Sequence, residues 1–222
     1  MKTVSVLGMW HEEHENNSYL NQYYSLKEIE KIIINYQPDV ILAELWPNWK
    51  EKYFSYCELP DFKLEYKKCI CPLVEKLGID IIPIDYGSLL YAKEFRYYEQ
   101  TKKDLVEFGD MKYKLYYKVD NVIFNAIPEV FKSAKEINSE ASNDLFQSLM
   151  DIDSLWFFKD NPEKDFWERH NQENFKHIES ILNQSNYKRI LITFGMQHKY
   201  WFERELKKKQ EIQFQSIVNY CE

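Results

Sequence analysis

Two short motifs of the same form, Gly-x-x-His, lie near opposite ends of the sequence. One is GMWH, from Gly8 to His11, and the other is GMQH, from Gly195 to His198. Each directly follows a run of apolar residues that is typical of a buried strand. Glycine allows a sharp turn and close approach of a ligand, and a neutral imidazole can act as a metal ligand or a general base. A structural role is the simpler explanation for either histidine alone, but their shared position predicts that the two motifs form one functional site.

Carboxylates occupy the corresponding position in two further predicted strands. Glu44 ends the run PDVILAE, and Asp85 ends the run IDIIPID. A carboxylate at the end of a buried apolar strand is costly unless it is paired or has a chemical role. The structural interpretation is that each is a partner for an arginine or a helix N-terminus. The functional interpretation is that both carboxylates join His11 and His198 at one edge of a sheet.

This set of side chains suits two kinds of chemistry. In the metal form, His11, Glu44 and His198 hold a divalent ion such as Mn, Co or Zn, which activates a water molecule. In the metal-free form, one histidine is the general base and Glu44 orients it. His198 suits both forms, because it is expected in the first turn of a helix, where the helix dipole disfavours the imidazolium ion.

His14 follows His11 in the segment HEEH. The spacing is one residue shorter than in the HExxH zinc motif, and the segment follows a strand instead of lying within a helix. We therefore predict that His14 is a loop residue at the rim of the site, with ligation of the metal as a weaker alternative.

The helix predicted before the fourth strand carries the polar segment Arg169, His170 and Asn171. The apolar face of this helix is formed by Trp167, Asn174, Phe175 and Ile178. On spacing alone, the three polar residues form an exposed face on the remaining arc.

Five apolar, β-rich runs are expected to position these residues. Helical patterns separate most of them, so the sequence predicts an α/β fold with a mostly parallel central sheet, right-handed crossovers and helices on both faces. In such a sheet, ligands bind beyond the carboxyl ends of the strands. The predicted strands are residues 3–7, 39–43, 79–84, 189–194 and 213–218, and the predicted helices are residues 25–35, 64–76, 166–182 and 199–209.

No strand pattern is present between residues 89 and 162. This stretch is helical in pattern and rich in Tyr, Phe and Leu, so we interpret it as a helical, lid-like insertion over the sheet edge. Neither border carries a Gly/Ser-rich linker, and we therefore assign residues 1–222 to a single domain.

Composition restricts the class of partner. The net charge of −7 argues against nucleic-acid binding, and the basic residues 207–209 are expected at a solvated helix end. The four cysteines form no CxxC pair, the first residues run into a predicted strand without a signal-peptide h-region and cleavage site, and no apolar run reaches the ~18 residues of a membrane helix. We expect a cytoplasmic protein that acts on a small molecule or peptide and has no membrane partner. The oligomeric state stays open.

Together, these motifs resemble the superfamily that joins the TraB, TIKI, GumN-like, ChaN and erythromycin esterase proteins. The shared pattern is a first Gly-x-x-His, a strand of the form PD-hydrophobic-Glu-Leu, an Arg-Asn helix and a late hydrophobic-Gly-x-x-His turn. The matching residues here are Gly8 and His11, Pro38-Asp39 with Glu44-Leu45, Arg169-His170-Asn171, and Phe194-Gly195 with His198.

The sequence departs from the family pattern in two places. His170 interrupts the adjacent Arg-Asn pair, which affects the anion-contacting role that the resemblance implies for Arg169. The late turn carries Met196 and Gln197 where relatives favour small residues, and this narrows the expected pocket.

The resemblance implies an α/β fold of the erythromycin esterase/ChaN-like type, with the site at the sheet edge. It implies metal-dependent peptide cleavage by analogy with TIKI proteins, or metal-independent ester cleavage by analogy with the esterases. ChaN-like relatives bind haem instead. Three hypotheses follow: a hydrolase, a haem- or small-ligand-binding module covered by the aromatic insertion, and an inactive scaffold that keeps the turns for structure.

Overall fold

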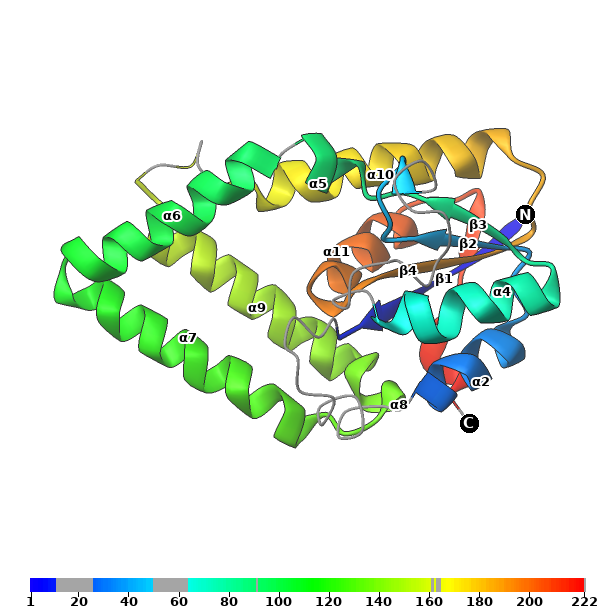
Figure 1. Cartoon of the computed structure of the whole chain (residues 1–222), viewed down its shortest axis with the longest axis horizontal. Coiled ribbons are helices and arrows are strands. Elements are labelled where there is room, and N and C mark those ends of the chain that lie inside the picture. The colour runs from blue at the N-terminus through cyan, green and yellow to red at the C-terminus, as the bar shows by residue number, and fades with distance from the viewer. Residues whose placement is uncertain (11–25, 50–63, 91, 161, 163–164, 222) are drawn as a thin grey trace.

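A parallel sheet of five strands lies at the centre of the described structure (Figure 1). The computed structural model describes residues 1–10, 26–49, 64–90, 92–160, 162 and 165–221. All pairings are parallel, and the strand order is β3-β2-β4-β1-β5. The strands are β1 (Lys2–Met9), β2 (Val40–Ala43), β3 (Asp80–Pro83), β4 (Arg189–Gly195) and β5 (Ile212–Phe214).

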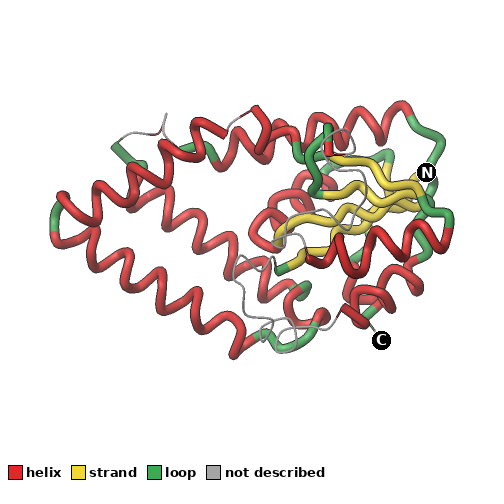
Figure 2. Tube along the Cα trace, viewed as in Figure 1, coloured by secondary structure: helices red, strands yellow, loops and turns green. Residues whose placement is uncertain are grey.

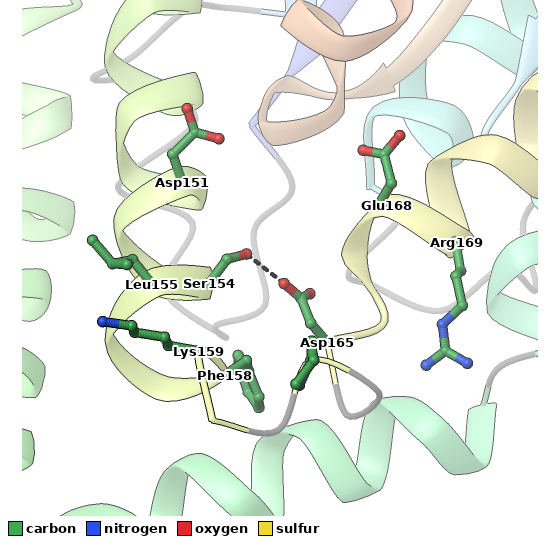
Figure 3. A pocket seen from close by; sticks show the side chains of 9 residues that line it. Asp151, Ser154, Leu155, Phe158, Lys159, Asp165, Glu168 and Arg169 are labelled. Carbon is green, nitrogen blue, oxygen red and sulfur yellow. Dashed lines mark hydrogen bonds between the residues drawn. The ribbon is translucent and has the colours of Figure 1, made fainter.

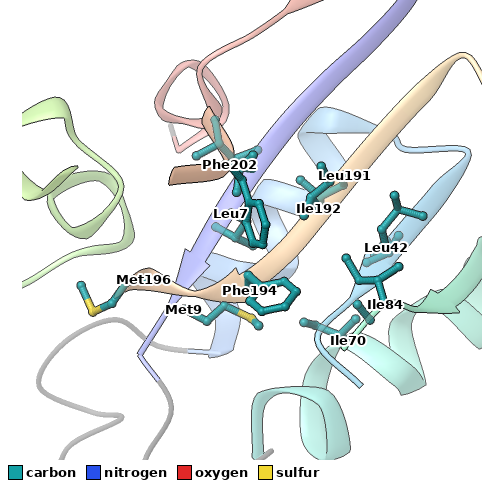
Figure 4. Packing of buried hydrophobic residues seen from close by; sticks show 14 of the residues in the cluster. Leu7, Met9, Leu42, Ile70, Ile84, Leu191, Ile192, Phe194, Met196 and Phe202 are labelled. Atoms are coloured by element: carbon teal, nitrogen blue, oxygen red, sulfur yellow. The ribbon is translucent and has the colours of Figure 1, made fainter. Parts of the chain in front are cut away.

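The three central strands owe their near-continuous apolar sequence to burial on both faces. Every residue of β2 and the last six of both β1 and β4 are buried, whereas the edge strand β3 is largely half-buried. Figure 4 shows Ile192, Phe194 and Phe202 among the buried residues of this core, and the rings of Phe194 and Phe202 lie edge to face with 4.8 Å between their centroids. The predicted α/β fold with a parallel sheet is therefore confirmed.

The last predicted strand is shorter than its sequence pattern indicates. β5 ends at Phe214, and the apolar pair Ile217 and Val218 belongs to a short 3-10 helix, Ile217–Tyr220. Ile217 is nevertheless fully buried. Its hydrophobicity reflects packing against the core, which a helical turn provides as well as a strand does.

Helices cover both faces of the sheet (Figure 2). On one side lie α2 (Leu26–Tyr36) and α4 (Cys71–Leu77), which a π-helical turn, Tyr66–Ile70, precedes. On the other side lie α10 (Trp167–Gln184) and α11 (Met196–Lys207). Gly78 ends α4 in the left-handed conformation, with φ of 66°, as its predicted C-cap role requires.

The strand order creates a switch point at β4. This strand lies between β1 and β2, whose connections lead to helices on one face, while β4 itself continues into α11 on the other face. Neighbouring connections that leave in opposite directions open a crevice at the carboxyl ends of the strands. The register sets Met9 beside Gly195 and Ala43 beside Thr193, so the motif residues Gly8, Glu44 and Gly195 meet at this edge.

The stretch between β3 and α10 is built from helices in its described part. They are α5 (Tyr86–Leu90), α6 (Ala92–Phe108), α7 (Met111–Val130), α8 (Ala134–Ile137) and α9 (Glu140–Phe157). In Figure 1, α6, α7 and α9 form an arm that projects beyond the carboxyl ends of the strands. Among the described residues, no helix is long and apolar enough to cross a membrane.

The arm is joined to the end of β1 by Asn138, which follows α8. Its side chain accepts a hydrogen bond from the N–H of Gly8 at 2.7 Å and donates one to the carbonyl of Gly8 at 3.1 Å. Because β5 pairs only with residues 2–4 of β1, this amide replaces a neighbouring strand at Gly8. Asn138 therefore completes the sheet edge next to the first motif.

Replacement of Asn138 by alanine is expected to lower the free energy of unfolding by about 2–4 kcal/mol, because it leaves a buried backbone N–H and a buried carbonyl of Gly8 without their partner. Urea unfolding followed by circular dichroism measures the change. Asn183→Ala, at an exposed position of α10, is the matched control and should change stability by less than about 0.5 kcal/mol. Equal effects of the two substitutions would contradict this role.

Candidate functional site

Glu44 connects the ends of two neighbouring strands at the switch point. It follows β2, its side chain is buried, and its Oε2 accepts a hydrogen bond from the N–H of Gly195 at 2.6 Å. Gly195 is the N-cap of α11, so the carboxylate lies at the positive end of this helix. This contact is the helix N-terminus partnership that the sequence suggested as the structural interpretation of Glu44.

Tyr66 also contacts the ends of β2 and β4. Its hydroxyl accepts a hydrogen bond from the N–H of Glu44 at 2.9 Å and lies 3.0 Å from the carbonyl of Thr193, to which it donates. Burial raises the pKa of Tyr66 well above its usual value, and the charge of Glu44 adds to this effect. The phenol is therefore neutral and fixes the spacing between β2 and β4.

His198 is the third residue of α11, in the first turn that the sequence predicted for it. It is 7% exposed, and its Nδ1 lies 2.6 Å from Oδ1 of Asn171 on α10. A carbonyl oxygen only accepts, so with this amide orientation Nδ1 carries the proton and Nε2 is the basic nitrogen. Trp167 stacks on the imidazole, with 4.3 Å between ring centroids. The ring is thus held in one orientation and one tautomer.

A second imidazole lies beside the first. The ring centroids of His170 and His198 are 5.1 Å apart, and Nε2 of His170 lies 3.5 Å from Oδ1 of Asp85. Asp85 is buried after β3, and its Oδ1 also accepts a hydrogen bond from the N–H of Ser88. Within the described residues, neither ring nitrogen of His170 has a hydrogen-bond partner. The side chains of Asp85, His170 and His198 therefore lie close together in a buried region between α10, α11 and the end of β3.

Close packing around Gly87 fixes the position of His170. A Cβ atom at Gly87 would lie 2.2 Å from Cδ2 of His170, so no larger residue fits there. The N–H of Gly87 donates to Oδ1 of Asn174 at 2.6 Å. Gly87 was not among the predicted site residues, and Asn174 was expected on the apolar face of the helix without a chemical role. The available signal was the spacing of His170, Asn171 and Asn174, which repeats at helical intervals with Phe175.

The structure corrects the expectation of an exposed polar face on this helix. His170, Asn171 and Asn174 are buried, and the last two have no exposed surface. Arg169 is half-buried and lines a separate cavity between α9 and α10. The polar face was assigned from the spacing of the residues, whereas tertiary packing against α5 and α11 makes it the inner face.

Arg169 lines a cavity of about 740 Å³ between the end of α9 and the beginning of α10 (Figure 3). Its charged and polar lining residues are Asp151, Ser154, Lys159, Asp165, Glu168 and Arg169. Figure 3 shows two of these residues in contact, since the hydroxyl of Ser154 donates a hydrogen bond to Oδ2 of Asp165. Since Trp167 stacks on His198, the cavity and the histidine pair share the first turns of α10.

The first motif is described only in part. Gly8 lies next to the end of β1, where a Cβ atom would meet Cδ of Lys199 at 2.7 Å, so a larger residue would displace this buried lysine side chain. His11 and His14 lie outside the described residues. The predicted meeting of His11 with His198 therefore stays a prediction.

The structure describes only two of the ligands that the sequence predicted for the metal form of the site. His198 belongs to the first turn of α11, and the carboxylate of Glu44, which follows β2, accepts a hydrogen bond from the N-cap residue of this helix. His11 and His14 belong to residues that the structure does not describe. Within the described ranges, no three His, Cys, Asp or Glu side chains are grouped as metal ligands.

No protein-family model matches the chain, and comparisons with curated proteins and with solved structures found no match.

Replacement of Tyr66 by phenylalanine is expected to cost about 1–2 kcal/mol at pH 7, because the buried N–H of Glu44 and carbonyl of Thr193 lose a partner. The pKa of Tyr66 is higher in the folded than in the unfolded chain, so its contribution is full below pH 10 and is lost as the pH rises above 10. The stability of Tyr66→Phe should therefore fall less steeply than that of wild type between pH 10 and 11.

Urea unfolding at pH 7, 9, 10 and 11 measures both effects. Tyr97→Phe, at an exposed position of α6, is the control and should follow the wild-type curve. A Tyr66→Phe curve parallel to wild type at every pH would show that the phenol is not perturbed.

Proposed function

We propose that the protein is a hydrolase of ester or amide bonds in which His198 is the general base. The single observation that supports this proposal is the buried contact of 2.6 Å between Nδ1 of His198 and Oδ1 of Asn171. A base oriented by a third group is the recurring arrangement in metal-independent acyl transfer. It also agrees with the metal-independent branch of the family that the sequence resembles.

The residues divide the reaction as follows. Nε2 of His198 takes a proton from a water molecule as the water oxygen attacks the substrate carbonyl carbon. The imidazolium then returns the proton to the leaving alcohol or amine as the tetrahedral intermediate collapses to the acid. Asn171 is a positioning residue, because it keeps the proton on Nδ1.

His170 is proposed to stabilise the oxyanion. One of its ring nitrogens carries a proton in the neutral form, and no described residue accepts it. Nε2 of His170 lies 3.5 Å from Oδ1 of Asp85, and this carboxylate orients the ring. A preorganised donor at a developing negative charge accounts for a large share of catalysis in such reactions.

The metal form of the proposal uses Glu44 and His198 together with His11, and a bound divalent ion would supply the activated water. The Gly195 N–H occupies Oε2 of Glu44, which supports a structural function for this carboxylate instead. We therefore favour the metal-free form and use metal removal to separate the two.

His198→Ala is expected to lower kcat/KM by about 10²–10⁴, the usual contribution of a general base. The measurement uses p-nitrophenyl acetate and p-nitrophenyl butyrate as ester probes and an acyl-alanine p-nitroanilide as the amide probe. His177→Ala, a half-buried histidine that stacks on Tyr86 elsewhere on α10, is the matched control and should keep wild-type activity. Activity that survives EDTA supports the metal-free form, and activity that EDTA removes and Mn, Co or Zn restores supports the metal form. Equal rates for wild type and His198→Ala would falsify both.

Asn171→Asp tests positioning separately from folding. A carboxylate beside the ring stabilises the imidazolium, so the acid limb of the pH profile of kcat/KM should move to higher pH by about one unit. Asn171→Ala should lower kcat without moving this limb in the same direction. Identical pH profiles for wild type and Asn171→Asp would rule out the proposed contact with the base.

A further inference from the structure

The arm helix α7 carries an apolar stripe on its outward face. Three of its residues are among the most exposed apolar side chains of the described structure, with Met111 at 77%, Val122 at 68% and Val130 at 63%. Leu115, Val119 and Ala126 lie between them and are also exposed. The six positions follow one another at intervals of four, four, three, four and four residues, which places them on one side of a helix.

The opposite side of α7 already has its partners. Tyr116 stacks on Trp156 of α9, with 4.1 Å between ring centroids, and Phe124 contacts Phe146 of α9 edge to face. Ile127 is buried in the main core. The outward stripe is therefore a second apolar face on a helix that its own arm already supports. A contiguous exposed apolar face of this kind marks an interaction surface.

We propose that this stripe binds the α7 helix of a second copy of the chain in an antiparallel pair. The six apolar positions are arranged symmetrically about the peptide bond between Asp120 and Asn121. A two-fold axis at this point sets each apolar residue opposite another, with the pairs 111–130, 115–126 and 119–122. An isologous dimer requires this self-complementarity, in which residue i meets j and j meets i.

The charged residues beside the stripe also favour an antiparallel pair. Lys112, Lys114 and Lys118 lie in the first half of α7, which ends at Asp120, and Glu129 lies in the second half. An antiparallel pair sets the basic half against the acidic half, whereas a parallel pair brings like charges together. The two-fold axis also sets Lys112 of each copy opposite Glu129 of the other, which gives two equivalent ion pairs.

The size of the helix suits this kind of contact. Its 20 residues span about 30 Å, and the stripe runs over the whole length. The arm carries α7 beyond the end of the sheet, so a second arm meets it without contact between the two sheets (Figure 1). The interface is independent of the proposed hydrolytic site, because none of its residues belongs to that site.

Sedimentation velocity from 1 to 100 µM tests the proposal first. Wild type should show a monomer–dimer equilibrium, and Leu115→Asp or Val122→Asp should weaken dimerisation at least a hundredfold. Ile34→Asp, which places the same charge at an exposed apolar position of α2, is the matched control and should leave the dimer intact. Thermal unfolding of each variant confirms that the monomers are folded.

Charge reversal then tests the direction of the pair. Lys112→Glu alone sets Glu against Glu129 twice, and Glu129→Lys alone sets Lys against Lys112 twice, so each should weaken dimerisation about tenfold. An equimolar mixture of the two variants should dimerise like wild type, because the heterodimer restores opposite charges at both positions. A parallel pair sets like charges together in wild type and in each variant alone, so it predicts no loss in either variant and a mixture that dimerises more tightly than wild type.

Several results would overturn the proposal. Wild type that stays monomeric at 100 µM, a dimer that survives Leu115→Asp, or a mixture that shows no rescue would each exclude it. A monomer that binds vesicles of anionic phospholipid through Leu115 and Val122 would assign the stripe to a membrane surface. A monomer that Leu115→Asp destabilises would assign it to a segment of the same chain.

Discussion

The arrangement of the site depends on one hydrogen bond, from the N–H of Gly195 to the carboxylate of Glu44. The first N–H groups of a helix have no partner within the helix, and a buried carboxylate needs donors, so each group satisfies the requirement of the other. The bond determines where α11 begins relative to the end of β2. His198 follows three residues later, and this position turns its ring toward α10 and Asn171.

The polar groups between α10 and α11 are costly for the fold. Asn171 and Asn174 are fully buried, and in the described structure their Nδ2 atoms and both nitrogens of His170 have no hydrogen-bond partner. Each such group costs about 1–3 kcal/mol, and apolar residues of similar size would pack there without this cost. Buried donors beside a fixed imidazole are, however, what an oxyanion or a substrate carbonyl requires. These buried groups therefore support the proposed chemical function over the scaffold hypothesis.

The sequence predicted the sheet and the turns far better than it predicted the helix faces. Apolar runs identify β1, β2 and β4 because strands buried on both sides leave a continuous signal, and Gly78 marks a helix end through its left-handed conformation. His170 and Asn171 carry no such signal. Whether a polar residue lies on the inner or outer face of a helix depends on what packs against it, here Gly87 and His198, which are distant in sequence. The partner of Gly8 was equally hidden, since Asn138 is 130 residues away.

Adjacent residues of α11 connect the site to the arm. His198 faces α10, whereas Lys199 is buried on the other side, where its Nζ lies 2.7 Å from Glu203 and donates to Asn143 of α9 at 3.0 Å. Farther out, Asp153 of α9 accepts hydrogen bonds from Tyr98 and Lys102 of α6. Movement of α9 against α11 would break the hydrogen bond between Lys199 and Asn143, and movement of α6 against α9 would separate Lys102 and Tyr98 from Asp153. Buried polar contacts tolerate little displacement, because separation leaves charges unpaired. These connections favour a rigid arm that presents the outer face of α7 over a hinged lid that closes on His198.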